Sequence, residues 1–414
     1  MRFIRDIRVI RGYRICEPTF ERNILKNLPL FPTQVIGSLP RTQSVRSLLF
    51  AGKEGRIKRS EFDKRMDEHV IFAIRLQELA GIDIVSDGEW RRHHYVEEFT
   101  DRVGGFKRDI IVGREGILFP GVVGRMSYDP SKPIFYRDAH FLVKHTNRVP
   151  KFALPSPYII MRRYWSPTKS TKAYPTRESF IEHLSEILHH EALAVVKAGA
   201  QVVQLDDPLV TYFCDPDYAS GKKVLADTGV FGKLDGELHL AVTHINRVFE
   251  GVKARRQLHC CHAVYKRQSD VHGHYAAILK YLLKANVHDL NLEFAYKGTG
   301  TANDLKHYPK DRGIGVGCVD VRLAKVTTPA EIIKTTDNAL KYVSAKQILL
   351  NPDCGFAPHH GEPPQVDEAF NKLKALADAA HLLRLRAKGK DIRKLLTNKH
   401  HSSVSHRYHL RTEN

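Results

Sequence analysis

The sequence predicts an α/β protein built as a (β/α)₈ TIM barrel, and two features of the chain support this prediction. Short runs rich in β-branched residues alternate with longer segments whose apolar residues recur every three or four positions, which is typical of parallel strands joined by helices. Eight such runs can be counted, as one closed barrel requires. An open, doubly wound sheet is the alternative that the pattern leaves open. The runs are QVIGSLP (34–40), DIVSDGEW (83–90), KFALPSP (151–157), QVVQLDDP (201–208), RQLHCCH (256–262), DLNLEFA (289–295), GIGVGCVD (313–320) and QILLNPDCG (347–355).

The segments between the runs carry the boundary signals of helices. Residues 59–81, 176–199 and 329–345 have apolar side chains at helical spacing. Several of these segments begin at Ser, Thr or Pro and end near Gly, which are the residues that favour helix ends. The stretch from about 91 to 150 is too long for a simple loop, and its Gly, Pro and aromatic content indicates an insertion after the second strand, such as a β-hairpin over the barrel mouth.

Length and charge divide the chain into one large domain and two basic ends. A length of 414 residues suits a single barrel, which we place at 32–385 after a basic N-terminal extension at 1–31. Residues 1–30 contribute +4 and residues 384–414 contribute +7 to the formal charge of +19. The tail at 386–414 loses apolar periodicity, which predicts disorder. No nucleic-acid-binding motif accompanies these charges, so nucleic acid is not expected as a partner.

Cysteine content and hydropathy indicate the compartment. Six cysteines are too few for a disulfide framework in a chain of this length, so we expect thiols in a reducing environment. No apolar stretch approaches the roughly 20 residues that span a bilayer, and the Arg-rich start lacks the apolar core of a signal peptide. We therefore expect a cytoplasmic protein with no membrane partner.

Polar side chains gather at the C-terminal ends of the predicted strands, where barrel enzymes place their chemistry. His259 and Cys261 are two positions apart, so both point to one face of their strand, while Cys260 and His262 point to the other. His nitrogen and Cys thiolate suit zinc, Glu can add an oxygen ligand, and Cys354 is the right residue type to complete a tetrahedral site. The spacing alone is a weak signal, because a buried cysteine is more often a small core residue.

Several motifs follow one another in a specific order, from VIGSLPRT through SDGEW, QLDDP, HCC, LNLEFA and VGCVDVR to NPDCG, over roughly residues 32–380. In this combination the chain resembles the catalytic domain of cobalamin-independent methionine synthase. The resemblance implies a Zn²⁺ site formed by His259, Cys261, Glu293 and Cys354. It also implies methyl transfer from 5-methyltetrahydrofolate, in its polyglutamate form, to the thiol of homocysteine, giving methionine. The metal would hold the substrate sulfur as a thiolate near neutral pH.

The same resemblance implies an amino-acid site beside the metal. Ile36, Gly37, Ser38, Glu89 and Asp206 match positions that hold the amino-acid part of homocysteine. Backbone N–H groups and a hydroxyl suit the substrate carboxylate, and carboxylates suit its ammonium group, through charge-assisted hydrogen bonds. A turn glycine and a helix cap are the structural alternatives for Gly37 and Asp206.

The donor side of the site departs from the family pattern, because the expected Asp-x-His is Asp320-Val321-Arg322 here. A methylated folate nitrogen must be protonated to leave, so a general acid is required. Arg has a pKa above about 12 and is a poor acid near neutral pH. The chain therefore either uses Asp320 or a neighbour as the acid, or takes the methyl group from another donor.

Three further residues and two further functions complete the hypotheses. Trp165, after the third strand, matches an aromatic residue that stacks on the pterin of the donor, with packing of the insertion as its alternative. His359 and His360 follow NPDCG and are expected at the surface. The alternative functions are a related zinc thiol alkyltransferase that uses a corrinoid protein or another donor, and a non-catalytic basic binding protein.

Overall fold

The computed structural model of the chain describes residues 28–107, 121–222, 232–264, 267–357 and 365–393, together with residue 395. Most of the predicted N-terminal extension and C-terminal tail lies outside these residues. His359 and His360 also lie outside them, so their expected surface position stays a prediction.

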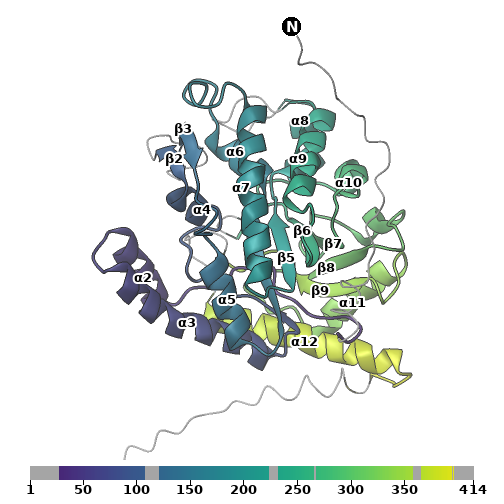
Figure 1. Cartoon of the computed structure of the whole chain (residues 1–414). Helices are drawn as coiled ribbons and strands as arrows, with labels where there is room; N and C mark the ends of the chain where they lie inside the picture. The colour runs from purple at the N-terminus through teal and green to yellow at the C-terminus, as the bar shows by residue number, and fades with distance from the viewer. Residues whose placement is uncertain are drawn as a thin grey trace, which may run out of the picture.

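Parallel strands form the centre of the molecule. Seven of them make one curved sheet in the order β1-β4-β5-β6-β7-β8-β9, with helices around it (Figure 1). Thr33 then bridges Leu350 of the last strand, and Gln34 bridges Ile84 of the first, both in parallel orientation. These bridges join the two edges of the sheet, which confirms the predicted barrel. The strands are β1 (Ile84–Val85), β4 (Val149–Pro155), β5 (Val202–Asp206), β6 (Arg255–Cys260), β7 (Asp289–Glu293), β8 (Gly313–Val319) and β9 (Ile348–Pro352).

The first predicted strand is wrong in its extent, because only its start bridges its neighbours. Beyond Gln34 the carbonyl groups bind side chains in place of a neighbouring strand: Lys151 Nζ donates to the Val35 carbonyl and Gln204 Nε2 donates to the Ile36 carbonyl at 3.0 Å. Strand β1 is also shorter than predicted, since Gly88 and Glu89 adopt positive φ angles of 69° and 57° soon after it. Both segments leave the ladder and form loops at one end of the barrel.

Helices follow the strands as the periodicity predicted. The helices predicted at 59–81, 176–199 and 329–345 are present, and Thr176 and Thr328 each form a capping box at a helix start. Helix α12 runs alongside α3 (Figure 1). The helices are α2 (Gln43–Lys53), α3 (Arg59–Ala80), α4 (Glu97–Arg102), α5 (Tyr136–His145), α6 (Pro157–Tyr164), α7 (Arg177–Lys197), α8 (Pro216–Ala219), α9 (Leu234–Val248), α10 (Ala276–Leu282), α11 (Pro329–Leu340) and α12 (Val366–Ala387), with 3₁₀ helices η1 (Val210–Cys214) and η2 (Ala302–Leu305).

The insertion between β1 and β4 contains the predicted β-hairpin. Strands β2 (Gly104–Lys107) and β3 (Gly121–Ser127) pair antiparallel, between α4 and α5 in the chain. Phe106 of β2 packs against Tyr164 of α6 and Phe180 of α7, with ring centroids 5.9 and 6.3 Å apart. These contacts fix the hairpin against the helices that follow β4.

The inside of the barrel changes from apolar to polar along its axis. Ile84, Val202 and Leu349 form a small apolar cluster at the N-terminal ends of the strands. Above them Lys151 Nζ donates to the side-chain oxygens of Gln34 and Gln204 at 3.2 and 3.1 Å. Burial lowers the pKa of Lys151 to about 7. The next layer, at the C-terminal ends of the strands, holds the candidate site.

Candidate metal centre

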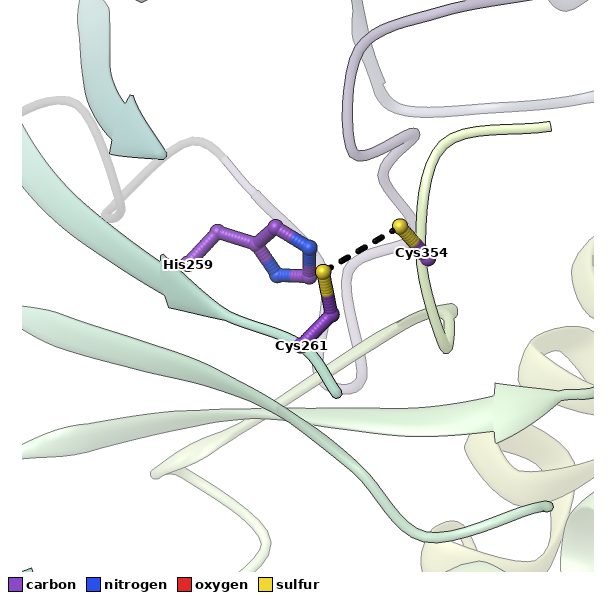
Figure 2. A group of neighbouring side chains, drawn as sticks. All are labelled: His259, Cys261 and Cys354. Atoms are coloured by element: carbon purple, nitrogen blue, oxygen red, sulfur yellow. Dashed lines mark hydrogen bonds between the residues drawn. The ribbon is translucent and has the colours of Figure 1, made fainter. Parts of the chain in front are cut away.

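The end of β6 and the loop after β9 bring three potential metal ligands together. The ligand atoms of His259, Cys261 and Cys354 all lie within 4.8 Å of one another, and the two Sγ atoms are 3.4 Å apart. All three side chains are buried. Figure 2 shows the imidazole and the two sulfurs turned toward a common point. We call these residues the thiol cluster.

The imidazole of His259 is oriented as a ligand. Its Nδ1 lies 3.2 Å from the Asn291 carbonyl oxygen of β7, to which it can donate a hydrogen bond. That bond leaves the lone pair on Nε2, which is buried and has no hydrogen-bond partner among the described residues. Metal-bound histidines are typically held in this way through their other nitrogen. A buried nitrogen of this kind suits a site where a metal or another ligand binds.

The sulfur spacing also suits a metal. Zinc bonds of about 2.0 to 2.3 Å in a tetrahedron put neighbouring ligand atoms roughly 3.3 to 3.8 Å apart. A hydrogen bond to Cys354, followed by burial, raises the pKa of the Cys261 thiol well above its usual range. Two thiolates at this distance repel each other, and a divalent cation between them removes that penalty. The thiol cluster thus fits zinc in geometry and in charge.

Glu293, the fourth ligand implied by the sequence, lies at the end of β7 but is bound to other side chains. Its Oε2 accepts hydrogen bonds from the N–H and Nδ1 of His262 at 2.9 and 2.8 Å. Its Oε1 accepts one from Nη2 of Arg322 at 2.8 Å. Burial alone would raise the pKa of Glu293, but Arg322 and His262 hold it at about 2. We call His262, Glu293 and Arg322 the ion-pair cluster.

The loop after β8 aims Arg322 at Glu293. Asp320 Oδ1 accepts the backbone N–H groups of Arg322 and Leu323 at 2.7 and 3.3 Å, which fixes the turn. The guanidinium also donates to the Ala263 carbonyl at 3.1 Å and lies 4.7 Å from the ring centre of Tyr296. The carboxylate of Asp320 therefore has a structural role, and its predicted role as a general acid stays a prediction.

Glu89 and Gly37, two of the predicted substrate residues, lie in direct contact. A Cβ at position 37 would collide with the Glu89 carboxylate, so any other residue would require that side chain to move. Arg41 donates to the carbonyls of Glu89 and Ala357 at 2.8 and 3.0 Å and so ties three loops together. Burial raises the pKa of Glu89 to about 7.

The other residues predicted to bind substrate lie on segments next to the thiol cluster. Ser38 Oγ accepts the N–H of Ala357 at 3.2 Å, which joins the segment at 36–38 to the loop that carries Cys354. Gln204 Nε2 donates to both the Ile36 carbonyl and Asp206 Oδ1, at 3.0 and 2.6 Å.

Asp206 also lies beside the thiol cluster, because it is in register with His259 across β5 and β6. Burial raises the pKa of Asp206. The residues predicted to bind substrate are thus connected to one another or to the thiol cluster by direct contacts, and their role in binding stays a prediction.

Trp165 lies at the end of α6 and contacts the segment that leads into α7. Its indole Nε1 donates to the Tyr174 carbonyl at 3.2 Å, and its ring packs on the core. Its predicted contact with the methyl donor remains a prediction.

Sequence reasoning missed three residues that shape the site. The spacing places His262 on the opposite face from His259, but it does not indicate that His262 pairs with Glu293. For Arg41, the only indication in the sequence is its position in the motif VIGSLPRT. Lys151 was visible as a lysine inside an apolar strand pattern, which is a sign of a buried, paired charge.

Comparison with known families shows to which family the chain belongs. The family model described as "Cobalamin-independent synthase, Catalytic domain" matches residues 31–382. The chain belongs to this family. The resemblance predicted from the motifs is thereby confirmed.

Relatives within the cobalamin-independent synthase family are similar over most of their length. The chain is 28% identical over 371 residues to a methionine synthase of Sulfurisphaera tokodaii, covering 88% of this chain and 96% of the relative. It is 29% identical over 361 residues to a methionine synthase of Pyrococcus horikoshii, covering 86% and 94%.

A solved family structure is also similar. It is that of a B12-independent methionine synthase from Shewanella sp. W3-18-1 in complex with selenomethionine, with a TM-score of 0.69 at 25% identity, over 87% of this chain and 100% of that one. Within the described part of this chain, no helix has the length and apolar character that crossing a bilayer requires.

Proposed function

We propose that this chain is a zinc-dependent methyltransferase that transfers a methyl group from 5-methyltetrahydrofolate, in its polyglutamate form, to the thiol of homocysteine and releases methionine. The observation that carries the proposal is the thiol cluster, whose two sulfurs and orphaned Nε2 of His259 face one point beside Glu89 and Asp206. A thiolate-rich metal site next to buried carboxylates suits a substrate that has both a thiol and an ammonium group.

His259, Cys261 and Cys354 would hold the zinc. When bound, the metal supplies a Lewis acid that lowers the pKa of the substrate thiol, and thiolates are the nucleophilic form. Donation from Nδ1 of His259 to the Asn291 carbonyl would leave the lone pair of Nε2 for the metal. The buried surroundings exclude water from the sulfur atoms.

The amino-acid end of the substrate would be bound by the loops of the first strands. Glu89 and Asp206 offer negative charge to its ammonium group, and the segment at 36–38 offers N–H groups and the Ser38 hydroxyl to its carboxylate. The Shewanella relative was solved with selenomethionine, an analogue of the product proposed here, which supports an amino-acid site of this kind.

A methyl-transfer assay with parallel donors tests the proposal. Zinc-loaded full-length chain is given homocysteine with 5-methyltetrahydrofolate, with its triglutamate, or with methylcobalamin, and methionine is measured. We expect methionine from the folate donors, and none from the Cys354→Ala variant. Methionine from methylcobalamin alone would assign the donor to the corrinoid class. No methionine from any donor, with zinc bound, would remove the proposal.

A further inference from the structure

We infer that Glu293 lies outside the coordination sphere of the metal in this chain, because Arg322 and His262 hold its carboxylate. The inference rests on the proposed function only in assuming a zinc ion at the thiol cluster. It departs from the ligand set that the family resemblance implies, in which Glu293 is the fourth ligand. The departure originates at position 322, where this chain has Arg in place of the expected His.

The spacing of the atoms is the first argument. The group whose ligand atoms all lie within 4.8 Å of one another contains His259, Cys261 and Cys354, and among the described residues Glu293 is not part of it. Ligands of a tetrahedral zinc ion lie roughly 3.3 to 3.8 Å apart. Glu293 would therefore have to move toward the sulfurs to bind the metal.

The bonds that hold Glu293 oppose such a movement. Its two oxygens accept three hydrogen bonds, from the N–H and Nδ1 of His262 and from Arg322, at 2.8 to 2.9 Å. Both side chains of the Glu293–Arg322 pair are fully buried. Breaking a buried ion pair leaves an uncompensated charge in a medium that solvates it poorly.

Arg322 has no equivalent partner to take instead. The carboxylate of Asp353 is 4.0 Å from its Nη1, and that carboxylate already accepts the N–H groups of Phe294, Ala295 and Tyr296. Nε and Nη1 of Arg322 have no hydrogen-bond partner among the described residues. Glu293 is thus the principal counter-charge of the guanidinium.

The resulting centre differs in charge from a four-ligand one. Two thiolates and one neutral imidazole balance the two positive charges of zinc, while Arg322 balances Glu293 separately. Three protein ligands also leave one position open, as is usual for catalytic zinc. A substrate thiol would then bind without displacing a protein ligand.

Zinc affinity measured by chelator competition on full-length protein tests the inference. Asp289→Asn is the matched control for Glu293→Gln, since Asp289 is on the same strand and forms the buried pair with Arg255. We expect both variants to lose no more than about 100-fold in zinc affinity, the range for residues that surround a metal site without binding the metal. A loss well beyond about 100-fold in Glu293→Gln alone would overturn the inference.

Arg322→His provides a second, independent test. Removing the guanidinium frees Oε1 of Glu293 while His262 still holds Oε2. The freed oxygen can then bind the metal, so the absorption spectrum of the cobalt-substituted variant should differ from that of the wild type, and the added change Glu293→Gln should restore the wild-type spectrum. If Glu293→Gln alone alters the wild-type cobalt spectrum while Arg322→His does not, the inference is wrong.

A crystal structure of the zinc-loaded wild type decides the matter if a variant does not fold. The inference expects both Glu293 oxygens beyond bonding distance, and an oxygen within about 2.2 Å of zinc contradicts it. The proposed function fails separately: wild-type protein that binds no zinc removes the metal site itself, whereas zinc bound with Glu293 as a ligand removes only this inference.

Discussion

The thiol cluster and the ion-pair cluster lie at the same end of the barrel, and they differ in whether the groups that could bind a metal already have partners within the protein. In the thiol cluster, Nε2 of His259 has no hydrogen-bond partner among the described residues, and the two sulfurs face each other. In the ion-pair cluster, both oxygens of Glu293 accept hydrogen bonds from His262 and Arg322. Both clusters include residues from the end of β6 or just beyond it.

The difference shows which group of polar residues requires a ligand. A buried polar atom without a partner is costly, so the chain tolerates it where something else binds. The Glu293 carboxylate is already paired with Arg322 and His262 and needs no ligand, although Nε and Nη1 of Arg322 have no hydrogen-bond partner among the described residues. We therefore expect the ion-pair cluster to stabilise the fold around the site, and we propose that the thiol cluster binds a metal. Four experiments test this distinction.

Arg322→Met should have the largest effect on stability. It leaves the Glu293 carboxylate buried without its guanidinium, which we expect to lower the free energy of unfolding by about 3 to 5 kcal/mol. Urea unfolding of the zinc-free protein measures this. Lys374→Met, which removes an exposed ion pair with Asp378, should cost less than about 1 kcal/mol. Equal losses in the two variants would show that the ion-pair cluster is not structural.

Zinc should stabilise the folded protein through the thiol cluster. At a free zinc concentration about 100 times the dissociation constant, we expect a gain of about 2.7 kcal/mol in the free energy of unfolding, because the metal binds the folded state. The gain should vanish in Cys354→Ala. It should persist in Cys318→Ala, which removes a buried thiol whose Sγ lies 3.6 Å from the Asn351 carbonyl oxygen. A gain that survives Cys354→Ala would place the metal elsewhere.

Binding of methionine should weaken as the pH falls, because Glu89 loses its charge. Burial raises the pKa of Glu89 to about 7, so below that pH the protonated carboxyl no longer attracts the ligand ammonium group. We expect affinity to fall about tenfold per pH unit from about pH 7 downward, measured by calorimetry. Glu89→Gln should remove this dependence and Glu191→Gln, which alters another buried carboxylate, should keep it. A dependence unchanged in Glu89→Gln would assign the titration to another group.

Thr328→Ala should have the smallest effect. The Thr328 hydroxyl caps α11, which follows the loop that carries Arg322, and its loss should cost about 1 kcal/mol. Zinc affinity should stay at the wild-type value. A parallel loss of zinc binding would mean that the loop as a whole, and not the ion pair, supports the site.

Local patterns predicted most of the fold. Strands β4 to β9 are buried on both faces and therefore appear as apolar runs, and their observed bounds lie close to the predicted ones. The first strand was overestimated because the bonds of Val35 and Ile36 come from Lys151 and Gln204, more than 100 positions away. No window of sequence around residue 35 contains that information.

The sequence predicts those site residues that a regular spacing or a motif identifies. The two-residue spacing of His259 and Cys261 gives their common face, and Cys354 entered through the resemblance of NPDCG. The pairing of Arg322 with Glu293 depends on how a long side chain reaches from the loop after β8 to the end of β7. Such a contact depends on tertiary packing, so the spacing of residues along the sequence does not indicate it.

The two bridges that close the barrel also bear on how the protein is made. Thr33 and Gln34 belong to the earliest described part of the chain, yet Thr33 pairs with Leu350, and Arg384 of α12 donates to the Phe31 carbonyl at 3.0 Å. On a ribosome these first residues emerge long before their partners. The growing chain must therefore keep an open sheet edge until its final strand and helix have been synthesised, and it is during this interval that protection by a chaperone would matter most.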